Sequence, residues 1–399
     1  MKVAQLLTGS TGGIGRHVAS IAPRLEQRGH QVRVFCPEAT AEAQGFAKLG
    51  LDVGPLTSPR RLIGADLIHA HGLKAGWLGL PIAWMYKLPL VVTWHNAVLG
   101  DGIAPAAARQ TLRAVALGAD LTLGASRDLV ALATRLGARN VRFSPIAAPV
   151  LPQAKMSREE QRRVLGAAAD DTVSVTVSRL APQKNLGMVL DIASAVRDRP
   201  DLRFVVVGEG PEHQKLQRRI TNDRLQVALL GRSDDIASLL GAADFALLTS
   251  TWEARALVAQ EALLAGVPLI STRVGGIEEL VDSAAVLVPP GDVEEAARQI
   301  VALADNPSER GRLREAGLRP VLGNEHLAVL KRIHCAGIDV EVRVQLLHGH
   351  TEPAGNKQVA ETGSRQPLAE RGGDASGDKE VLGKSLAVSH GPPAYVVEC

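Results

Sequence analysis

Glycines follow the first predicted strand at a spacing that suits the binding of an anion. Residues 8–15 read Thr-Gly-Ser-Thr-Gly-Gly-Ile-Gly and run directly into a predicted helix. Glycine lets the backbone turn tightly and approach a ligand, and the start of a helix presents free N–H groups to negative charge. The segment predicts a phosphate-binding loop; the alternative is a tight strand–helix turn that binds nothing.

Two cations occupy a comparable place in the second half of the chain. The predicted strand that begins at Val173 delivers Arg179, and Lys184 follows five residues later at the head of a predicted helix. Positive side chains at the carboxyl end of a strand, beside a helix N-terminus, suit a diphosphate group.

Two carboxylates, Glu253 and Glu261, are separated by eight positions in a segment with helical character. At about 100° per residue they would lie within about 80° of each other on a helix. The spacing therefore predicts that both face one cleft. Alternatively, Glu253 is a favourable charge at the N-terminus of the helix.

The glycine segment also resembles the cofactor loop of short-chain dehydrogenases/reductases, in which Glu38 would hold a ribose. That family needs a catalytic tyrosine with a lysine four positions later. The chain has two tyrosines, and neither Tyr86 nor Tyr395 has a lysine at that place. A dehydrogenase therefore lacks its proton donor here and is kept as an alternative hypothesis.

The composition excludes several other classes of protein. Aromatic residues make up 3% of the 399 residues, which argues against a base-stacking nucleic-acid surface, and a net charge of +3 is small for a dedicated polyanion binder. The three cysteines (Cys36, Cys335 and Cys399) are far apart in the sequence, and the chain contains no Asp-x-Asp motif. We therefore predict neither a metal site nor a cofactor, and no nucleic-acid partner.

The site candidates are positioned by short apolar strands that alternate with amphipathic helices, a pattern typical of parallel sheets covered on both faces. The predicted strands are Val3–Leu7, Gln31–Phe35, Leu67–His71, Leu88–Trp94, Leu121–Leu123, Val173–Val177, Arg203–Val207, Val227–Leu229, Phe245–Leu248 and Pro268–Ser271. The proline-rich segment Pro145–Pro152 reads as a linker between two repeats of the pattern. We predict an α/β protein with two doubly wound, Rossmann-like domains, 1–150 and 157–317, facing a central cleft.

Six segments in this order resemble the retaining, nucleotide-sugar-dependent glycosyltransferases of family 4, which have the GT-B fold. The resemblance covers residues 1–317. The segments are GGIGRHV (12–18), SRLAPQKN (178–185), VVGEGP (206–211), WEARALVAQEALLAGVP (252–268), VGGIEELV (274–281) and LVPPGD (287–292).

The resemblance implies a role for each matching residue. Arg179 and Lys184 would neutralise the donor diphosphate as it leaves, and Glu261 would hold the ribose hydroxyls. Glu253 would contact the transferred sugar or stabilise the reacting centre. Gly208 would belong to the donor site, and Gly13 would let its loop close over the phosphates and the acceptor. The acceptor side would comprise Gly12, Gly13, Arg16 and His71.

Three histidines stand at predicted strand ends. His95, in Thr93-Trp94-His95-Asn96, matches the cleft histidine of the family, whereas His69 and His71 are weaker candidates. A structural role for the imidazole is the alternative for all three.

The implied function is transfer of a hexosyl group from a nucleotide-diphosphate sugar to a lipid, glycan or small-molecule acceptor, with retention and without a metal. The leaving diphosphate needs stabilisation of its negative charge, which the two cations and helix N-termini would supply. An inactive nucleotide-sugar-binding protein, an epimerase and a phosphorylase with the same fold stay open. Ala254-Arg255-Ala256 departs from the family, in which glycine and an aromatic residue are common, and this puts the donor preference in doubt.

The first domain is the more basic one. Residues 1–150 hold 16 Lys and Arg against 8 Asp and Glu, a net charge of +8. Arg60-Arg61, Lys74 and Lys87 flank the apolar segment Trp77–Tyr86, which suits an anionic membrane surface or a lipid-linked acceptor. We favour the other interpretation, that Trp77, Trp84 and Met85 pack in the core. We expect a cytoplasmic protein without a signal peptide, with peripheral attachment to the inner membrane face as the alternative.

The end of the chain departs from the pattern. The alternation of elements fades from Pro320 onward, and no aromatic residue occurs between Trp252 and Tyr395. We expect residues 320–399 to be an atypical, partly disordered tail that lacks the crossing-back helix of the family. A divergent end and a shifted reading frame are the two hypotheses for it.

Overall fold

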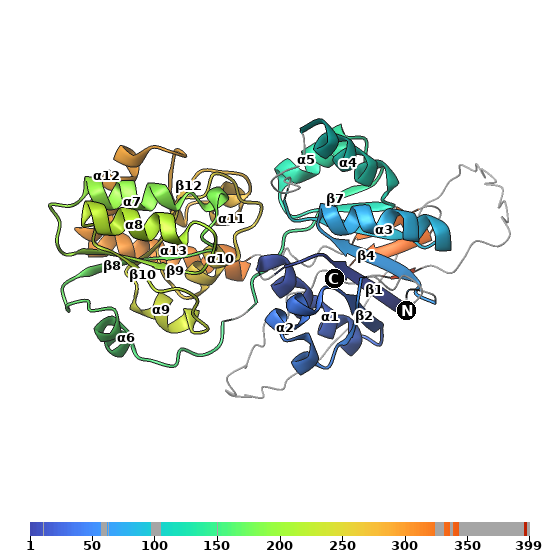
Figure 1. Ribbon diagram of the computed structural model, residues 1–399, viewed down its shortest axis with the longest axis horizontal. Helices are drawn as coiled ribbons and strands as arrows, with labels where there is room; N and C mark the ends of the chain where they lie inside the picture. Colours follow the sequence, from blue (N-terminus) through green and yellow to red (C-terminus); the bar gives the residue numbers. More distant parts are fainter. Residues whose placement is uncertain are drawn as a thin grey trace, which may run out of the picture. The chain divides into compact units, whose positions relative to one another are not determined.

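The computed structural model describes residues 1–10, 12–56, 62, 64–96, 105–149, 151–323, 331–335, 338–342 and 395–396. Most of the predicted tail, 320–399, lies outside these residues, as do Arg60 and Arg61. Residues 1–346 with 394–399 form one compact unit that contains both large sheets. Figure 1 shows each sheet with its helices.

The first sheet has seven parallel strands in the order β3-β2-β1-β4-β5-β6-β7. Its strands are β1 (Lys2–Leu7), β2 (Gln31–Phe35), β3 (Asp52–Gly54), β4 (Leu67–His71), β5 (Leu90–Trp94), β6 (Leu121–Gly124) and β7 (Val141–Phe143). The strand order reverses between β1 and β4. In doubly wound sheets a ligand binds outside the carboxyl ends of the strands at such a reversal.

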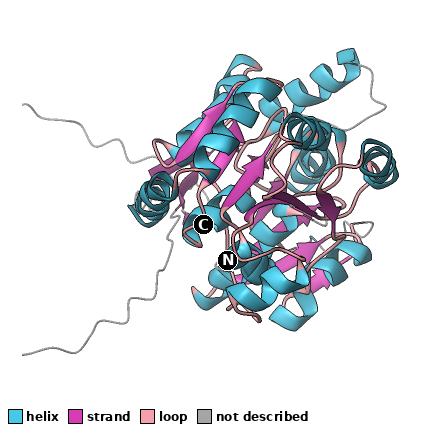
Figure 2. Cartoon of the chain, turned by 90° about the vertical axis from the view of Figure 1, so that its left-hand side faces the viewer, coloured by secondary structure: helices cyan, strands magenta, loops and turns pink. Residues whose placement is uncertain are grey.

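Helices cover both faces of this sheet, and Figure 2 distinguishes the helices of the chain from its strands by colour. Its helical segments are α1 (Gly13–Gln27), α2 (Glu38–Gln44), the 3-10 turn η1 (Phe46–Leu49), α3 (Leu73–Tyr86), α4 (Pro105–Gly118) and α5 (Arg127–Arg135). Apolar side chains of α1 pack with β1 and β2 in one core cluster. Side chains of α3, α4 and α5 pack in a second cluster, so these three helices cover the opposite face.

The second sheet has six parallel strands in the order β10-β9-β8-β11-β12-β13. They are β8 (Thr172–Val177), β9 (Leu202–Val207), β10 (Val227–Leu229), β11 (Phe245–Leu248), β12 (Leu269–Thr272) and β13 (Ala285–Val288). The strand order reverses between β8 and β11. The predicted α/β class with two Rossmann-like sheets is therefore confirmed.

Eight helices and one 3-10 turn of the described chain belong to this half. They are α6 (Arg158–Val164), η3 (Pro182–Lys184), α7 (Leu186–Ala195), α8 (His213–Asp223), α9 (Ile236–Ala242), α10 (Leu257–Leu264), α11 (Ile277–Val281), α12 (Val293–Ala304) and α13 (Pro307–Gly323). A small third sheet joins β14 (Lys331–Cys335), β15 (Ile338–Val342) and β16 (Tyr395–Val396).

The segment between the two large sheets is anchored in spite of its prolines. The side-chain amide of Gln260 donates to the carbonyl oxygen of Ile146 and accepts from the N–H of Ala148, both at 3.0 Å. Ile146 and Ala148 are themselves buried. The segment that reads as a linker is thus held against α10.

The prediction that Trp77, Trp84 and Met85 pack in the core is wrong. In α3 these side chains are 49%, 84% and 65% exposed, respectively. The small residues Ala75, Gly76 and Gly79 occupy the sheet side of the helix instead. A Cβ on Gly76 would approach Val115 and Val92 to 2.9 Å, so the close packing of α3 turns its large side chains outward.

Among the described residues, no helix is both long enough and apolar enough to cross a membrane.

Candidate active site

Lys184 and Glu253 form an ion pair at the strand-order reversal of the second sheet. The chain leaves β8 toward Arg179 and η3, and it leaves the neighbouring strand β11 toward Glu253. The Nζ of Lys184 lies 2.5 Å from Oε1 of Glu253. Opposite charges therefore stand where a ligand of this fold class is expected.

Glu253 is oriented by several further contacts. Its side chain is buried, and the hydroxyl of Ser250 donates to Oε1 at 2.7 Å. The N–H of Gly276 donates to the backbone carbonyl of Glu253 at 2.8 Å. No hydrogen bond from a described residue reaches Oε2. One carboxylate oxygen is thus held by the protein, and the other is left to accept a bond from a ligand.

The prediction that Glu253 and Glu261 share one helix is wrong. Glu253 lies in the loop after β11, and α10 begins four residues later at Leu257. The N–H of Thr251 donates to the carbonyl of Gln183 at 2.9 Å, and Gly276 bonds to Glu253, so neighbouring loops hold this segment outside the helix. The calculated angle of about 80° therefore does not describe the pair.

Glu261 pairs with Arg16, which lies in the first turn of α1. The carboxylate of Glu261 is almost fully buried, and one guanidinium nitrogen of Arg16 contacts its Oε1. The glycine loop lies nearby, because a Cβ on Gly13 would be 3.4 Å from Leu257 at the start of α10. A Cβ on Gly12 would meet no atom within 4 Å. The first turn of α1 and helix α10 thus meet through Arg16, Gly13 and Glu261.

Gly208, directly after β9, occupies a position that requires glycine. Its φ is +142°, and a Cβ there would lie 1.8 Å from the carbonyl oxygen of Ser178. This close approach brings the end of β9 against the residue that precedes Arg179. Arg179 is exposed and forms no ion pair with the part of the chain that the structure describes.

Four histidines cluster at the strand-order reversal of the first sheet. His69 and His71 belong to β4, His95 follows β5, and His17 lies in α1. The ring centroids of His17 are 5.5 Å from those of both His71 and His95, and the rings of His69 and His71 are 4.1 Å apart. The cluster joins all three predicted histidines with one that the sequence analysis did not single out.

A chain of polar contacts links this cluster to β1. Nε2 of His71 lies 2.5 Å from Oε1 of Gln5, and Nδ1 of His71 lies 3.4 Å from Nε2 of His95. With the Gln5 oxygen as acceptor, His71 carries its proton on Nε2 and accepts from His95 at Nδ1. His95 then keeps an unprotonated Nδ1 that can accept a hydrogen bond.

Burial keeps these imidazoles neutral. Desolvation lowers the pKa of His17 to about 4, with help from the charge of Arg24. Desolvation lowers the pKa of His69 to about 3, and it holds the pKa of His71 and of His95 well below the usual range. The mutual repulsion of the histidines acts in the same direction. At neutral pH the cluster therefore offers polar contacts without positive charge.

Several residues of the two sites carried signals that the sequence analysis did not use. Gln5 is the polar residue within the apolar run Val3–Leu7 of β1, and His17 directly follows Arg16 in the GGIGRHV segment. Trp252 precedes Glu253, and its indole N–H donates to Asp128 of α5 at 2.8 Å. The contact of Ser250 with Glu253 depends on the loop conformation, which no spacing rule predicts.

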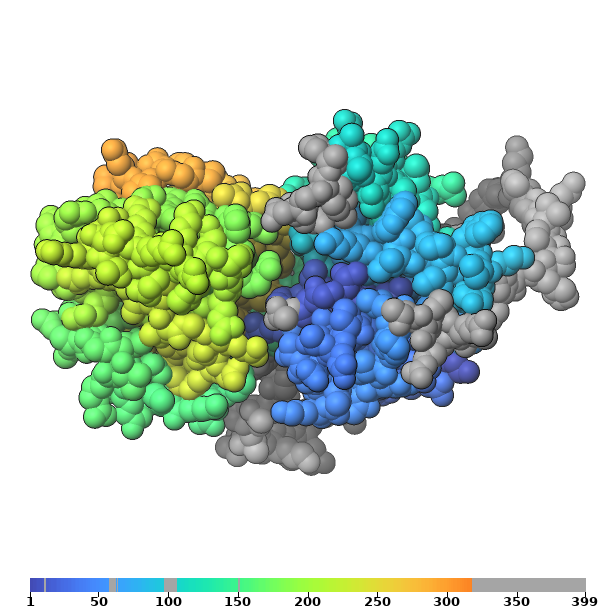
Figure 3. All heavy atoms as spheres, in the orientation of Figure 1, coloured from blue at the N-terminus to red at the C-terminus, as the bar shows by residue number. Residues whose placement is uncertain are grey.

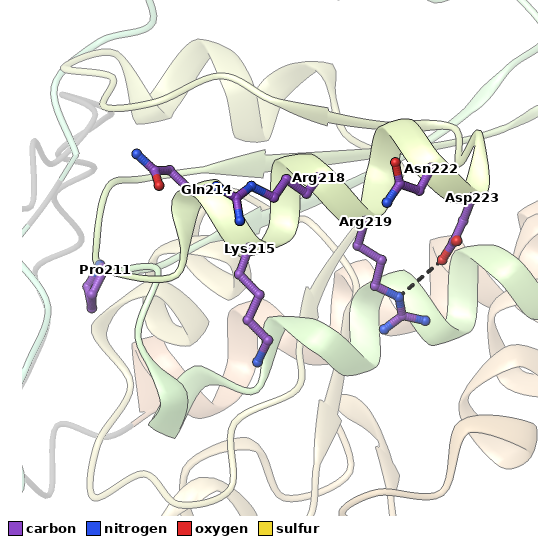
Figure 4. A pocket seen from close by; sticks show the side chains of 7 residues that line it. All are labelled: Pro211, Gln214, Lys215, Arg218, Arg219, Asn222 and Asp223. Carbon is purple, nitrogen blue, oxygen red and sulfur yellow. Dashed lines mark hydrogen bonds and ion pairs between the residues drawn. The ribbon is translucent and has the colours of Figure 1, made fainter.

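A groove of about 510 Å³ runs along α8, and Figure 4 shows its lining. It is lined by Pro211, Gln214, Lys215, Arg218, Arg219, Asn222 and Asp223. Arg219 is paired with Asp191 and Asp223. None of the predicted site residues lines this groove, and nearly all of its surface comes from one helix.

No group of three or more His, Cys, Asp or Glu in the described residues has an arrangement that could hold a metal ion.

The chain has two Rossmann-like domains with parallel sheets, which is the GT-B class of fold. In each domain, polar residues lie at the strand-order reversal. The chain matches the family described as glycosyl transferase 4-like domain over residues 12–148 and glycosyl transferases group 1 over residues 157–319. The chain belongs to the family 4 type of glycosyltransferases, as its six motifs indicated.

Two curated relatives and one solved structure illustrate what the chain is similar to in sequence and in fold. The chain is 28% identical to a D-inositol 3-phosphate glycosyltransferase of Nocardia farcinica over 80% of its length and 82% of the relative. It is 29% identical to an N-acetyl-alpha-D-glucosaminyl L-malate synthase of Bacillus anthracis, over 37% of this chain and 40% of the relative. Its fold resembles that of Anabaena Alr3699/HepE in complex with UDP-glucose, with a TM-score of 0.72, 21% identity and coverage of 82% and 98% of the two chains.

Proposed function

We propose that the protein transfers a hexosyl group from a nucleoside-diphosphate sugar to a hydroxyl group of a lipid, glycan or small-molecule acceptor. The Lys184–Glu253 pair at the reversal of the second sheet is the observation that carries this proposal. The solved structure of Anabaena Alr3699/HepE with UDP-glucose supports a nucleotide sugar as the donor. UDP sugars are therefore the first donors to test, with GDP and ADP sugars beside them.

Lys184 and Arg179 would bind the donor diphosphate. Breaking the bond between C1 of the sugar and the diphosphate oxygen leaves negative charge on the diphosphate, and cations placed there stabilise it. Arg179 is exposed and carries no competing ion pair among the described residues. The N–H groups at the start of α7, directly after Lys184, would add to the same charge stabilisation.

Glu253 would contact the transferred sugar through its Oε2, while Ser250 and Lys184 hold Oε1. His95, kept neutral by burial, would accept a hydrogen bond from a sugar hydroxyl at its Nδ1. Glu261 would hold the ribose hydroxyls, with Gly208 shaping the donor site. Gly12, Gly13, Arg16 and His71 would lie on the acceptor side.

The transfer would proceed with retention and without a metal or a cofactor. The acceptor oxygen would form its bond to C1 on the face from which the diphosphate departs, and the acceptor proton would pass to the departing diphosphate oxygen. Neither Glu253 nor Glu261 is needed as a glycosidase acid, since no leaving alcohol requires protonation.

The test is to monitor hydrolysis of the donor sugar through its anomeric proton signal in NMR, in the presence of EDTA. We expect slow hydrolysis of one UDP, GDP or ADP sugar, with an α-linked sugar released initially as the α-anomer. Loss of this turnover in Glu253→Gln with donor binding retained would support the assigned role. Donor binding without turnover in the wild type would point to an inactive binding protein, and turnover abolished by EDTA would contradict the metal-free reaction.

A further inference from the structure

The outward side of α3 is apolar, although it faces solvent. Its exposed residues are Lys74, Trp77, Leu78, Pro81, Trp84 and Met85. At about 100° per residue these six positions fall within an arc of about 120° on the helix. We call this arc the α3 stripe.

The stripe is not explained by the fold. A helix that is apolar on all sides is normally buried on all sides. The sheet side of α3 is buried in the core of the first sheet, whereas Trp84 is 84% exposed. In Figure 3 the light-blue atoms of this part of the chain lie at the surface on the side facing the viewer. The α3 stripe is therefore an exposed apolar surface that is suited to binding a partner.

The charged side chains on α3, at its C-terminal end and on α4 are all positive. The described residues from 67 to 118 include four charged side chains, Lys74, Lys87, Arg109 and Arg113, and each is exposed. Neither α3 nor α4 contains an acidic residue, and the two helices pack side by side on the sheet. A partner of this face would therefore carry negative charge.

Tryptophan, methionine and leucine flanked by lysine match a lipid–water interface better than a protein surface. The indole ring buries its apolar body at the level of the headgroups, and lysine reaches anionic phosphates while its stem stays apolar. Trp77 and Trp84 are seven positions apart, so both rings reach the same plane beside the helix. The occupant that combines an apolar layer with a negative surface is an anionic bilayer.

We infer that the α3 stripe docks on an anionic membrane surface, with α3 lying parallel to it. The stripe begins three residues after His71, so the docked helix would hold the acceptor side of the proposed site next to the membrane. The docking itself does not depend on the proposed transfer reaction and can be tested without it.

The test is co-sedimentation of the full chain with vesicles of phosphatidylcholine, alone or mixed with phosphatidylglycerol. We expect binding to the mixed vesicles that weakens with salt, and little binding to the neutral ones. Trp77→Ser combined with Trp84→Ser should weaken binding by at least about tenfold, and Lys74→Gln by about fivefold. Val164→Ser, which alters an exposed apolar residue of α6, should bind as the wild type does.

Tryptophan fluorescence gives a second readout. Trp84 should shift to shorter wavelength on binding and be quenched by brominated lipid, whereas Trp94 is fully buried and reports the fold. Equal binding to neutral and anionic vesicles, or wild-type binding by the double tryptophan variant, would overturn the inference. So would a dimer in sedimentation velocity that the double variant abolishes, because a second copy would then cover the stripe.

Discussion

At the scale of single residues, the candidate site depends on how Glu253 is held. Lys184 and Ser250 both contact Oε1, so the carboxylate presents its second oxygen in a fixed direction. The sequence motifs were sufficient to single out Lys184, Glu253 and Glu261 as candidate site residues. The loop conformation that holds Glu253 could not, because it depends on backbone bonds to Gln183 and Gly276, far away in the sequence.

The histidine cluster makes the stability of the protein sensitive to acid. The native state keeps His17 neutral down to about pH 4, because burial lowers its pKa, whereas an unfolded chain takes up the proton near pH 6.5. The unfolded state therefore binds more protons between these values, and the free energy of unfolding falls as the pH drops from about 6.5 to about 4. Above about pH 6.5 this contribution to the pH dependence vanishes.

Urea unfolding at pH 7.5, 5.5 and 4.5 measures this effect. The variant His17→Gln lacks the titrating group, so its unfolding free energy should fall less steeply than that of the wild type over this range. Identical pH dependence in the two proteins would show that His17 is protonated equally in the native and unfolded states.

At the scale of elements, alternating apolar strands and helices were sufficient to predict ten strands of the two large sheets within two residues. The short strands β3, β7 and β13 were missed, because three or four residues carry little periodic signal. The orientation of α3 was predicted wrongly because its residues are apolar on nearly every side. Which side is buried follows from Gly76, which packs against Val92 and Val115, and this is a property of the packing.

The turn after β9 is an element that glycine alone permits. Gly208→Ala would place a Cβ against the carbonyl of Ser178 at a φ that side chains rarely adopt. We expect a loss of roughly 2 kcal/mol or more in the free energy of unfolding, together with weaker nucleotide binding, because the end of β8 must shift.

Gly187→Ala is the matched control for this change. Gly187 lies in the first turn of α7, and a Cβ there would meet no atom within 4 Å. Alanine favours a helix over glycine, so this variant should be as stable as the wild type or more stable by up to about 1 kcal/mol. Chemical denaturation gives the free energy of unfolding of both variants. Equal values for Gly208→Ala and Gly187→Ala would refute the strain assigned to a side chain at position 208.

At the scale of the molecule, Arg16 and Glu261 join the two large sheets. Resemblance to the family indicated that both residues serve the site, but it did not predict that they contact each other. Arg16→Ala would leave the buried carboxylate of Glu261 without its partner. The Arg16 side chain is 37% exposed whereas that of Glu261 is buried, so we expect a loss of about 2 kcal/mol in the free energy of unfolding from leaving one buried carboxylate without its partner.

Arg33→Ala is the comparison for this prediction. Arg33 pairs with Asp52, and both side chains are exposed, so its loss should cost less than about 1 kcal/mol. Differential scanning calorimetry of the two variants and the wild type tests the difference. Similar melting temperatures for the two variants would mean that the Arg16–Glu261 contact stabilises the protein no more than the exposed Arg33–Asp52 pair does.

The most direct test of the central claim is isothermal titration calorimetry with UDP, GDP and ADP. We predict that one of them binds the wild type, that Lys184→Ala weakens this binding by at least about tenfold, and that Lys215→Ala in the α8 groove leaves it unchanged. Absence of binding by all three at millimolar concentration, or equal affinity in the wild type and Lys184→Ala, would contradict a nucleotide-sugar site at the reversal of the second sheet.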